Sequence, residues 1–268
     1  MIRLRLRQAP GLRLDLRGLT PAALAGLDAA AIERLPLAQG RHALPLAEFF
    51  DVTAEGDGDT LVFEGDLSRC DRIGWQMAAG RIVVEGPVGD HAGAGMTAGV
   101  LQVQGDAGLL AACEMAGGEL RIDGNVGDFA ASAQPGSLDG MRGGSLVVRG
   151  NAGARCGDRM RRGTVLVFGD AGDFLASRMV AGSIALGGSA GAHVGYGMRR
   201  GSLVFAGAAP TVAATFVPAI SEAPVIWQLL ARDLARHGGP FAALPSRRVQ
   251  RHLGDLAAGG KGELLIVH

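Results

Sequence analysis

The sequence predicts an all-β fold, a right-handed parallel β-helix (solenoid) of about seven glycine-rich coils of 19 residues each. Two observations support this prediction. Seven of the eight methionines are separated by 19, 19, 26, 19, 19 and 19 residues. Glycine is the outlier of the composition, with 44 residues that follow no collagen-like period. A 19-residue unit is too short for a strand-helix-strand crossover, but it matches one solenoid coil that hydrogen-bonds to the next.

Residues 1–57 predict an N-terminal cap, which a solenoid needs because its open end exposes unpaired backbone. The first eight residues, MIRLRLRQ, alternate between apolar and polar, as a strand does and a signal peptide does not. Residues 20–37 predict helical structure, with Thr20 as the N-cap and Pro21 at the first helical position. A half-formed coil, residues 58–77, joins this cap to the first full unit.

Each unit predicts a strand, a corner, a short strand and a second corner. Three residues after each methionine comes a glycine, and the sixth and eighth positions, counting the methionine as the first, are apolar. This alternation is typical of a strand with one buried face. The sixth and eighth residues are Ile82 and Val84, Leu101 and Val103, Leu120 and Ile122, Leu146 and Val148, Val165 and Val167, Ile184 and Leu186, and Leu203 and Phe205.

A glycine series follows the strand and predicts tight corners, where positive φ or close backbone stacking excludes larger side chains. The series is Gly86, Gly89 and Gly93 in the first unit, Gly150, Gly153 and Gly157 in the fourth, and Gly188, Gly191 and Gly195 in the sixth. In the second, third and fifth units the last glycine becomes Ala112, Ala131 and Ala176.

The single 26-residue spacing indicates a seven-residue insertion near SAQPGSLDG, residues 132–140, that loops out without disturbing its neighbours.

Residues 209–268 predict the C-terminal cap. It should contain a helix within residues 221–239, ended by Gly238, and a final strand over residues 262–268. The predicted domains are therefore an N-terminal cap (1–57), the parallel β-helix (58–208) and a helix-containing C-terminal cap (209–268).

Composition excludes several classes of function. The net charge is zero and aromatic residues make up 4% of the chain, which argues against a nucleic-acid partner. No apolar run approaches the length of a membrane span, so we expect a cytoplasmic protein with no membrane contact. The three cysteines are widely spaced without a CxxC pair, which argues against a disulfide framework or a zinc knuckle and fits a reducing cytosol.

Motifs that resemble ligand sites recur with the period and are interpreted structurally. GAGMTAG and GYGMRRG are followed by strands, whereas a dinucleotide or phosphate loop requires a helix. Asp90, Asp128 and Asp173 share one phase, but the calcium-binding nonapeptide pattern is absent, so we interpret them as solvated corner carboxylates. The methionine column is interpreted as core.

His91 and His193 also share a phase, yet five coils, about 24 Å, would separate them, so they cannot share a metal ion. Their phase is otherwise a variable packing or surface position. No Ser-His-Asp, Cys-His or paired-carboxylate constellation stands out from the repeat. The sequence therefore predicts no catalytic, cofactor-binding or metal-ligating residue.

Five arginines are the candidate interface. They take the two positions after methionine in the fourth, fifth and seventh units, where the first three units have alanine, threonine or glycine. Stacking should gather them on one face of the C-terminal half, suited to an acidic partner or ligand. The alternative is a solvated charged face. These residues are Arg142, Arg161, Arg162, Arg199 and Arg200.

The repeated Gly-x-x-Gly-x-x-x-Gly series, preceded by Met-x-x-Gly, resembles the β-helix domain shared by the C subunit of formylmethanofuran dehydrogenase and the C-terminal domain of the glutamate synthase large subunit. The flanks resemble the former, a stand-alone chain, including its relative in the bacterial formyltransferase/hydrolase complex. They read IERLPLAQGRHALPLAEFFDV (residues 32–52) and HLGDLAAGGKGELLIV (residues 252–267). The likeness covers nearly the whole chain, and the arginine-rich, lysine-poor composition favours the bacterial version.

This resemblance implies a non-catalytic scaffold in one-carbon metabolism. In such complexes other chains hold the molybdenum or tungsten pterin, the iron-sulfur clusters and the metallohydrolase centre. The implied partners are a metallohydrolase subunit, a formate-dehydrogenase-like subunit and a formyltransferase subunit, and zinc is a metal that the resemblance implies for these partners. The complex would move a formyl group between a tetrahydromethanopterin carrier, a methanofuran-type carrier and formate, and this chain would bind no cofactor itself.

Two other functions stay open at this point. The arginine face could grip the poly-acidic tail of the furan carrier, which would make the chain a binding module. Alternatively, the chain could be a spacer like the glutamate synthase domain. An acyltransferase of the hexapeptide-repeat type is excluded because it needs a six-residue period and the observed one is 19.

Overall fold

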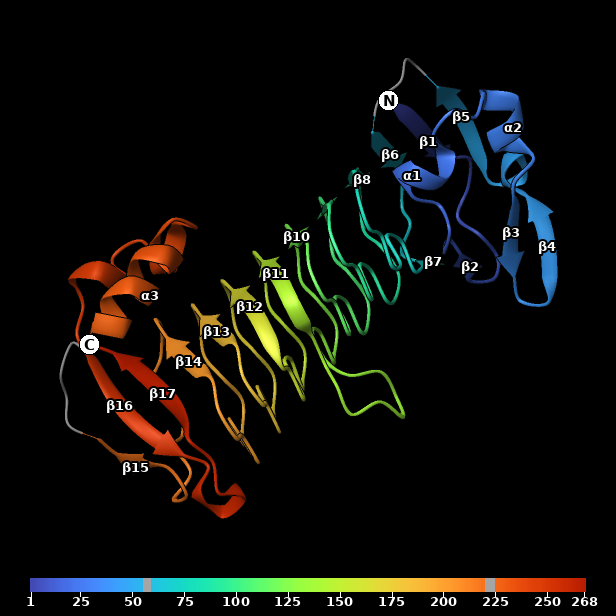
Figure 1. The fold of residues 1–268 in the computed structure, drawn as a ribbon. Helices are drawn as coiled ribbons and strands as arrows, with labels where there is room; N and C mark the ends of the chain where they lie inside the picture. The colour runs from blue at the N-terminus through green and yellow to red at the C-terminus, as the bar shows by residue number, and fades with distance from the viewer. Residues whose placement is uncertain (55–58, 220–224) are drawn as a thin grey trace.

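The computed structural model describes residues 1–54, 59–219 and 225–268, and strands dominate its regular structure. Within these residues a mixed sheet of thirteen strands runs the length of the molecule (Figure 1). Its spatial order is β15-β16-β17-β14-β13-β12-β11-β10-β9-β8-β6-β1-β5. The prediction of a mainly β protein is confirmed.

The bounds of the strands follow. The large sheet contains β1 (Ile2–Leu6), β5 (Phe50–Ala54), β6 (Thr60–Glu64), β8 (Arg81–Glu85), β9 (Val100–Val103), β10 (Glu119–Ile122), β11 (Arg142–Val148), β12 (Arg162–Val167), β13 (Ser183–Leu186), β14 (Ser202–Phe205), β15 (Val217–Pro218), β16 (Val249–Gly254) and β17 (Gly262–Val267). A second sheet of the described chain, ordered β4-β3-β2-β7, contains β2 (Leu14–Asp15), β3 (Pro36–Gln39), β4 (His42–Pro45) and β7 (Cys70–Asp71).

Strands β8 to β14 pair side by side in chain order, and every pair is parallel. Leu101 lies opposite Ile82 on one side and Leu120 on the other, so the predicted 19-residue register is the register of the sheet. Leu120 lies opposite Leu146 on the far side of the insertion. The insertion therefore loops out and leaves the pairing intact, as predicted. We call residues 77–207 the repeat stack.

The short second strand of each unit is reduced to one bridging residue. Parallel bridges join Leu67, Val88, Ala107, Val126, Ala152, Ala171 and Ala190 in sequence. These residues are small or β-branched for the most part, and they hold one side of each unit against the next without a regular strand.

The interior of the repeat stack is a single apolar column. All seven repeat methionines are buried, and so are all the residues at the sixth and eighth positions. The interpretation of methionine as core is confirmed. Each unit alone cannot cover its apolar face, so burial is completed only by the units above and below.

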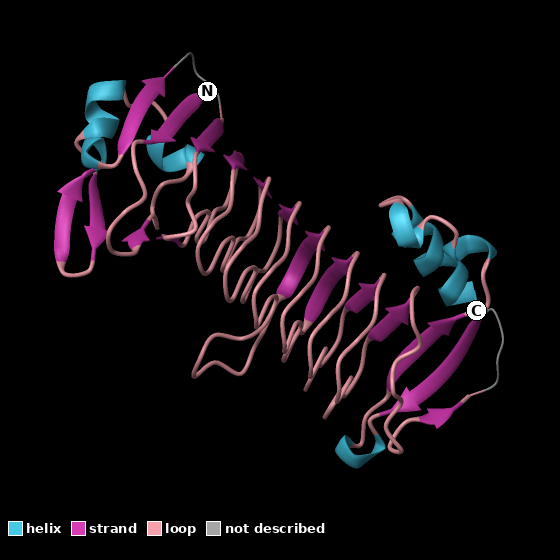
Figure 2. Ribbon diagram, turned by 180° about the vertical axis from the view of Figure 1, so that it is seen from behind, coloured by secondary structure: helices cyan, strands magenta, loops and turns pink. Residues whose placement is uncertain are grey.

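Helices lie at the two ends of the molecule, with the stacked strands between them (Figure 2). The α-helices of the described residues are α1 (Pro21–Leu24), α2 (Ala29–Glu33) and α3 (Val225–Ala235), and the 3-10 helices are η1 (Leu46–Glu48), η2 (Gly239–Phe241), η3 (Leu244–Ser246) and η4 (Leu256–Ala258). None of these helices is long and apolar enough to cross a membrane.

The N-terminal helical segment begins as predicted. The Thr20 hydroxyl accepts a hydrogen bond from the backbone N–H of Ala23 at 3.3 Å, and Pro21 is the first helical residue. The segment is divided in two, because Gly26 has a φ of 76° and Asp28 caps a new helix. This break is the αL glycine stop common at helix ends.

The C-terminal helix ends earlier than predicted. Predicted residues 221–224 lie outside the described residues. Helix α3 ends at Ala235, and a short hydrogen-bonded turn reaches Gly238, whose φ is 72°. The predicted final strand is confirmed as β17, which pairs in parallel with β14 and so closes the last unit.

Helix α3 and the 3-10 turns after it cover the outer face of the later strands. Val147, Leu166, Ala185 and Val204, which point away from the interior column, form a second buried cluster with Trp227 and other residues of this segment. The later strands are therefore buried on both faces, whereas the equivalent residues of β9 and β10 are the partly buried Gln102 and the exposed Arg121.

Candidate functional site

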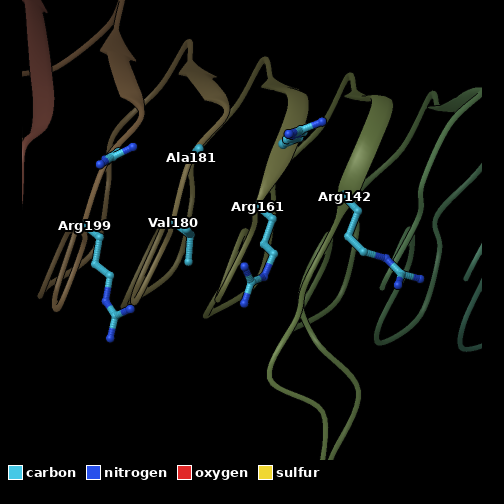
Figure 3. Close-up of a pocket in the computed structure, with 7 residues that line it drawn as sticks. Arg142, Arg161, Val180, Ala181 and Arg199 are labelled. Carbon is cyan, nitrogen blue, oxygen red and sulfur yellow. The ribbon is translucent and has the colours of Figure 1, made fainter.

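The candidate arginines are positioned by a backbone ladder. The carbonyl of each of the first six repeat methionines accepts a hydrogen bond from the residue that follows the next methionine. Met141 accepts from Arg161, Met160 accepts from Val180, and Met179 accepts from Arg199, each at 2.8 Å. This ladder places equivalent side chains of successive units on one face. Figure 3 shows Arg142, Arg161, Val180 and Arg199 in a row across the units.

The structure brings all five predicted arginines together. With Val180 and Ala181 they line an open groove of about 590 Å³, which we call the arginine groove. The two apolar residues come from the sixth unit, which carries no arginine at these positions, and they separate the arginines of the fifth unit from those of the seventh.

Charge in the arginine groove is poorly balanced. Arg161 forms an ion pair with Asp139 of the insertion. The Arg142 guanidinium donates to the carbonyl of Glu114 at 3.4 Å and has no ion pair within the described part of the chain. Among the described residues, no carboxylate pairs with Arg162, Arg199 or Arg200.

The backbone pairs Arg142 with Arg162 at the register shift between β11 and β12, which places two arginines on neighbouring strands. The planar guanidinium fork matches carboxylate and phosphate groups. The arginine groove is therefore chemically suited to an anionic partner.

One basic residue beside the seventh unit was not anticipated from the sequence. The N–H of Lys261 donates to the carbonyl of Arg199 at 2.6 Å, which places the backbone of the chain's only lysine next to the seventh unit. Its position depends on the pairing of β17 with β14, which joins residues far apart in the sequence. No local signal could have indicated it.

The corner carboxylates have a structural role that the sequence did not predict. Asp90 accepts from the N–H of Leu109 at 2.9 Å, Asp128 from Ala154 at 2.7 Å and Asp173 from Ala192 at 2.7 Å. Each donor lies in the next unit. Asp128 and Asp173 are exposed at their corners, as predicted, and Asp90 is partly buried. In addition, each carboxylate ties its corner to the following one.

The phase shared by His91 and His193 is a corner in which every residue has positive φ, including Leu110 and Phe129 at 60° and 62°. The side chains stack between units, with the rings of Phe174 and His193 4.7 Å apart. Burial, followed by repulsion from the Arg72 guanidinium, lowers the pKa of His91. Across the described residues, no group of three or more His, Cys, Asp or Glu side chains is arranged to hold a metal ion.

The three cysteines are buried and free. Burial raises the pKa of each thiol to about 12. Because the thiolate is the reactive form, these thiols are inert in the folded protein.

No known family model matches the chain. Among characterised proteins, it is similar to the C subunit of the formyltransferase/hydrolase complex Fhc of Methylorubrum extorquens, with 44% identity over 89 residues, 33% of each chain. It is also similar to the C subunit of the molybdenum-containing formylmethanofuran dehydrogenase 1 of Methanosarcina barkeri, with 41% identity over 89 residues, 32% of this chain and 30% of that one. These sequence matches span about a third of the relatives' length.

A solved structure extends the similarity to almost the whole chain. A chain in the crystal structure of the formyltransferase/hydrolase complex FhcABCD from Methylorubrum extorquens, in complex with methylofuran, matches with a TM-score of 0.92 and 42% identity. The match covers 98% of both chains.

Proposed function

Because this chain belongs to the family of formylmethanofuran dehydrogenase-type C subunits, we propose that it is the non-catalytic structural subunit of a formyl-handling complex in one-carbon metabolism. The other subunits would be a metallohydrolase that carries zinc, a formate-dehydrogenase-like chain and a formyltransferase. Together they would move a formyl group between a tetrahydromethanopterin carrier, a methanofuran-type carrier and formate, in the cytoplasm.

The observation that carries this proposal is the end-to-end match to a chain of the FhcABCD complex, at 42% identity. Similarity of this extent includes the two ends as well as the repeats. A rigid stack is also suited to a scaffold, since each unit is hydrogen-bonded to the next along both its strand and its corner.

We further propose that the chain is a right-handed parallel β-helix, residues 58–208, between an N-terminal cap (1–57) and a C-terminal cap (209–268). The parallel pairing in chain order and the parallel corner bridges support this description. Strand β1 pairs with β6 of the half-formed coil, and β17 pairs with β14 of the last unit, so both ends of the stack are covered, as a solenoid requires.

In this proposal the arginine groove is a docking surface for an acidic partner. Arg162, Arg199 and Arg200 supply the unbalanced positive charge that favours a partner with clustered carboxylates. A second candidate is the poly-acidic tail of a furan-type carrier. The open, arginine-lined groove favours it, and the related complex was solved with methylofuran.

The test begins with purification of the native chain with its partners, identified by mass and assayed for molybdenum, tungsten and zinc. We expect the partners named above. A chain that purifies without partners, or one that alone turns over a formylated furan carrier, would overturn the scaffold function.

A triple variant, Arg162→Ser, Arg199→Ser and Arg200→Ser, then tests the groove. Loss of assembly would identify a subunit interface, and loss of bound carrier from an intact complex would identify the carrier site. A matched control replaces three exposed arginines of the N-terminal segment, Arg5, Arg34 and Arg41, by serine. If the two triple variants behave alike, the groove is only a solvated face.

A further inference from the structure

The seven-residue insertion carries the most exposed apolar side chain of the repeat stack. Leu138 lies in the loop of residues 132–140, called the insertion loop here, and is 73% exposed. The loop projects from the stack between β10 and β11 (Figures 1 and 2). A large apolar side chain held this far into water is a mark of an interaction site when others lie beside it.

Other exposed apolar residues lie next to the insertion loop. Within the repeat stack, the other large apolar side chains that remain exposed are Leu109, Phe129 and Tyr196. Leu109 and Phe129 line a groove next to the insertion loop, which we call the corner groove. Exposed apolar surface in the repeats is therefore concentrated on one edge rather than scattered.

The insertion loop is held in place by the units on either side of it. Arg159 donates to the carbonyl of Ser137 at 2.7 Å, and Asp139 pairs with Arg161. At the start of the loop the buried Ser132 hydroxyl donates to the carbonyl of Phe129 at 2.6 Å. A loop fixed in this way loses little conformational entropy on binding, so its contacts contribute more of their energy to affinity.

The corner groove is the concave counterpart of this projection. Its volume is about 410 Å³, and its walls are the corner residues Leu109, Leu110 and Phe129, the loop residues 133–137, and the charged Asp158, Arg159 and Arg178. A projecting leucine next to an apolar groove lets this chain insert a side chain into a partner and receive one from it. Such packing, with anchors in pockets, is typical of the centre of a protein interface.

The charged residues that line the corner groove are two arginines and one aspartate. Asp158 is 4% exposed and is held by Arg178 through hydrogen bonds of 2.7 and 2.8 Å. The same carboxylate is the nearest acid to Arg159, at 3.9 Å. Two arginines thus share one buried carboxylate. A second copy of this chain would place arginines against arginines, which disfavours self-association.

We propose that Leu138 and the corner groove form a docking surface for another subunit of the complex, which presents an apolar pocket to Leu138 and carboxylates around it. This inference rests on the proposed function, because it takes the occupant to be a subunit of the same assembly. The surface is distinct from the arginine groove, although Asp139 of the insertion loop pairs with Arg161 of that groove.

The test uses the complete complex, produced by co-expression with one tagged partner subunit. The variant is Leu138→Asp, which places a charge in the pocket expected to receive the leucine. We expect the apparent dissociation constant for this chain to rise about 30-fold or more, the effect of removing an interface hot spot. Leu138→Met, which keeps an apolar side chain, should bind within about threefold of the wild type.

The matched control is Leu12→Asp, which changes a leucine that is 59% exposed in the N-terminal segment. We expect it to leave assembly unchanged. Equal binding by Leu138→Asp and the wild type would overturn the inference, and so would equal weakening by the two aspartate variants. If Leu138→Asp fails to accumulate as folded protein, Leu138→Ser replaces it under the same criteria.

The result separates this inference from the proposed function. A wild-type chain that joins no complex contradicts the proposed function itself. A wild-type chain that assembles, together with a Leu138→Asp chain that assembles equally well, removes only the docking surface.

Discussion

Replacing Gly99 by alanine should separate two neighbouring units of the repeat stack. Gly99 follows Met96 by three residues and has a φ of 85°. A Cβ atom added there would lie 2.6 Å from the carbonyl oxygen of Gly80 in the preceding unit. That oxygen accepts the inter-unit hydrogen bond from the N–H of Val100 at 3.0 Å. The substitution therefore strains the backbone and pushes against a bond that holds the units together.

The insertion loop provides a control in which alanine strains the backbone without pressing against a neighbouring unit. Gly136 has a φ of 88°, but nothing lies within 4 Å of the Cβ it would gain. Both substitutions place alanine in the left-handed region, which costs about 1–2 kcal/mol. Only Gly99→Ala also forces extra volume into packed backbone, which costs about 1–3 kcal/mol more. We expect a loss of about 1–2 kcal/mol for Gly136→Ala and of about 2–5 kcal/mol for Gly99→Ala.

Equilibrium unfolding in urea, followed by circular dichroism, measures both free energies of unfolding. The reasoning is refuted if Gly99→Ala destabilises the protein no more than Gly136→Ala does. That result would mean that the units can move apart at no cost, and that close stacking is not what requires glycine at this position.

Two further predictions concern titratable groups. Hydrogen bonds from the backbone N–H of Ser189 and then from its hydroxyl lower the pKa of Asp170 from 3.8, so the stabilisation is present above that value and is lost as the pH falls through the lowered one. Asp170→Asn should keep the neutral-pH stability, because one unit earlier the amide oxygen of Asn151 accepts the equivalent bond, from the N–H of Asp170, at 2.8 Å. The variant should also lose this acid dependence. Identical urea midpoints for variant and wild type across the acid range would contradict the prediction. The buried thiols, with pKa values of about 12, should resist iodoacetamide at pH 8 until urea is added, as mass spectrometry can check; native-state labelling at the unfolded rate would contradict this.

Features that every unit repeats were predictable from the sequence. A buried methionine such as Met160 packs against equivalent residues in the units above and below. The same packing requirement therefore selects the same residue type in every unit, and the sequence shows it as a period. The gathering of the five candidate arginines follows from that register alone. Their ion pairs do not, since the insertion that supplies Asp139 lies outside the period.

Other features could not be predicted because they break the rules that local reasoning uses. Leu110 and Phe129 occupy left-handed corners that such reasoning reserves for glycine. The burial of the outer face of β11–β14 was also not predicted, although the sequence contains a signal for it. Leu166 and Val204 are apolar there, whereas the equivalent Arg121 is charged, and this contrast indicates that only the later units are covered by a helix.

The constant register of the repeat stack has a consequence for the order in which the chain folds. Neighbouring strands pair residues 19 positions apart, as Leu101 and Leu120 do, which is about 0.07 of the chain length. Contact separations this short are typical of fast-folding helical bundles, not of all-β proteins. Units can therefore add one at a time to a growing nucleus, even before synthesis ends. The closing strand β17 must wait, because its partner β14 lies about 60 residues earlier.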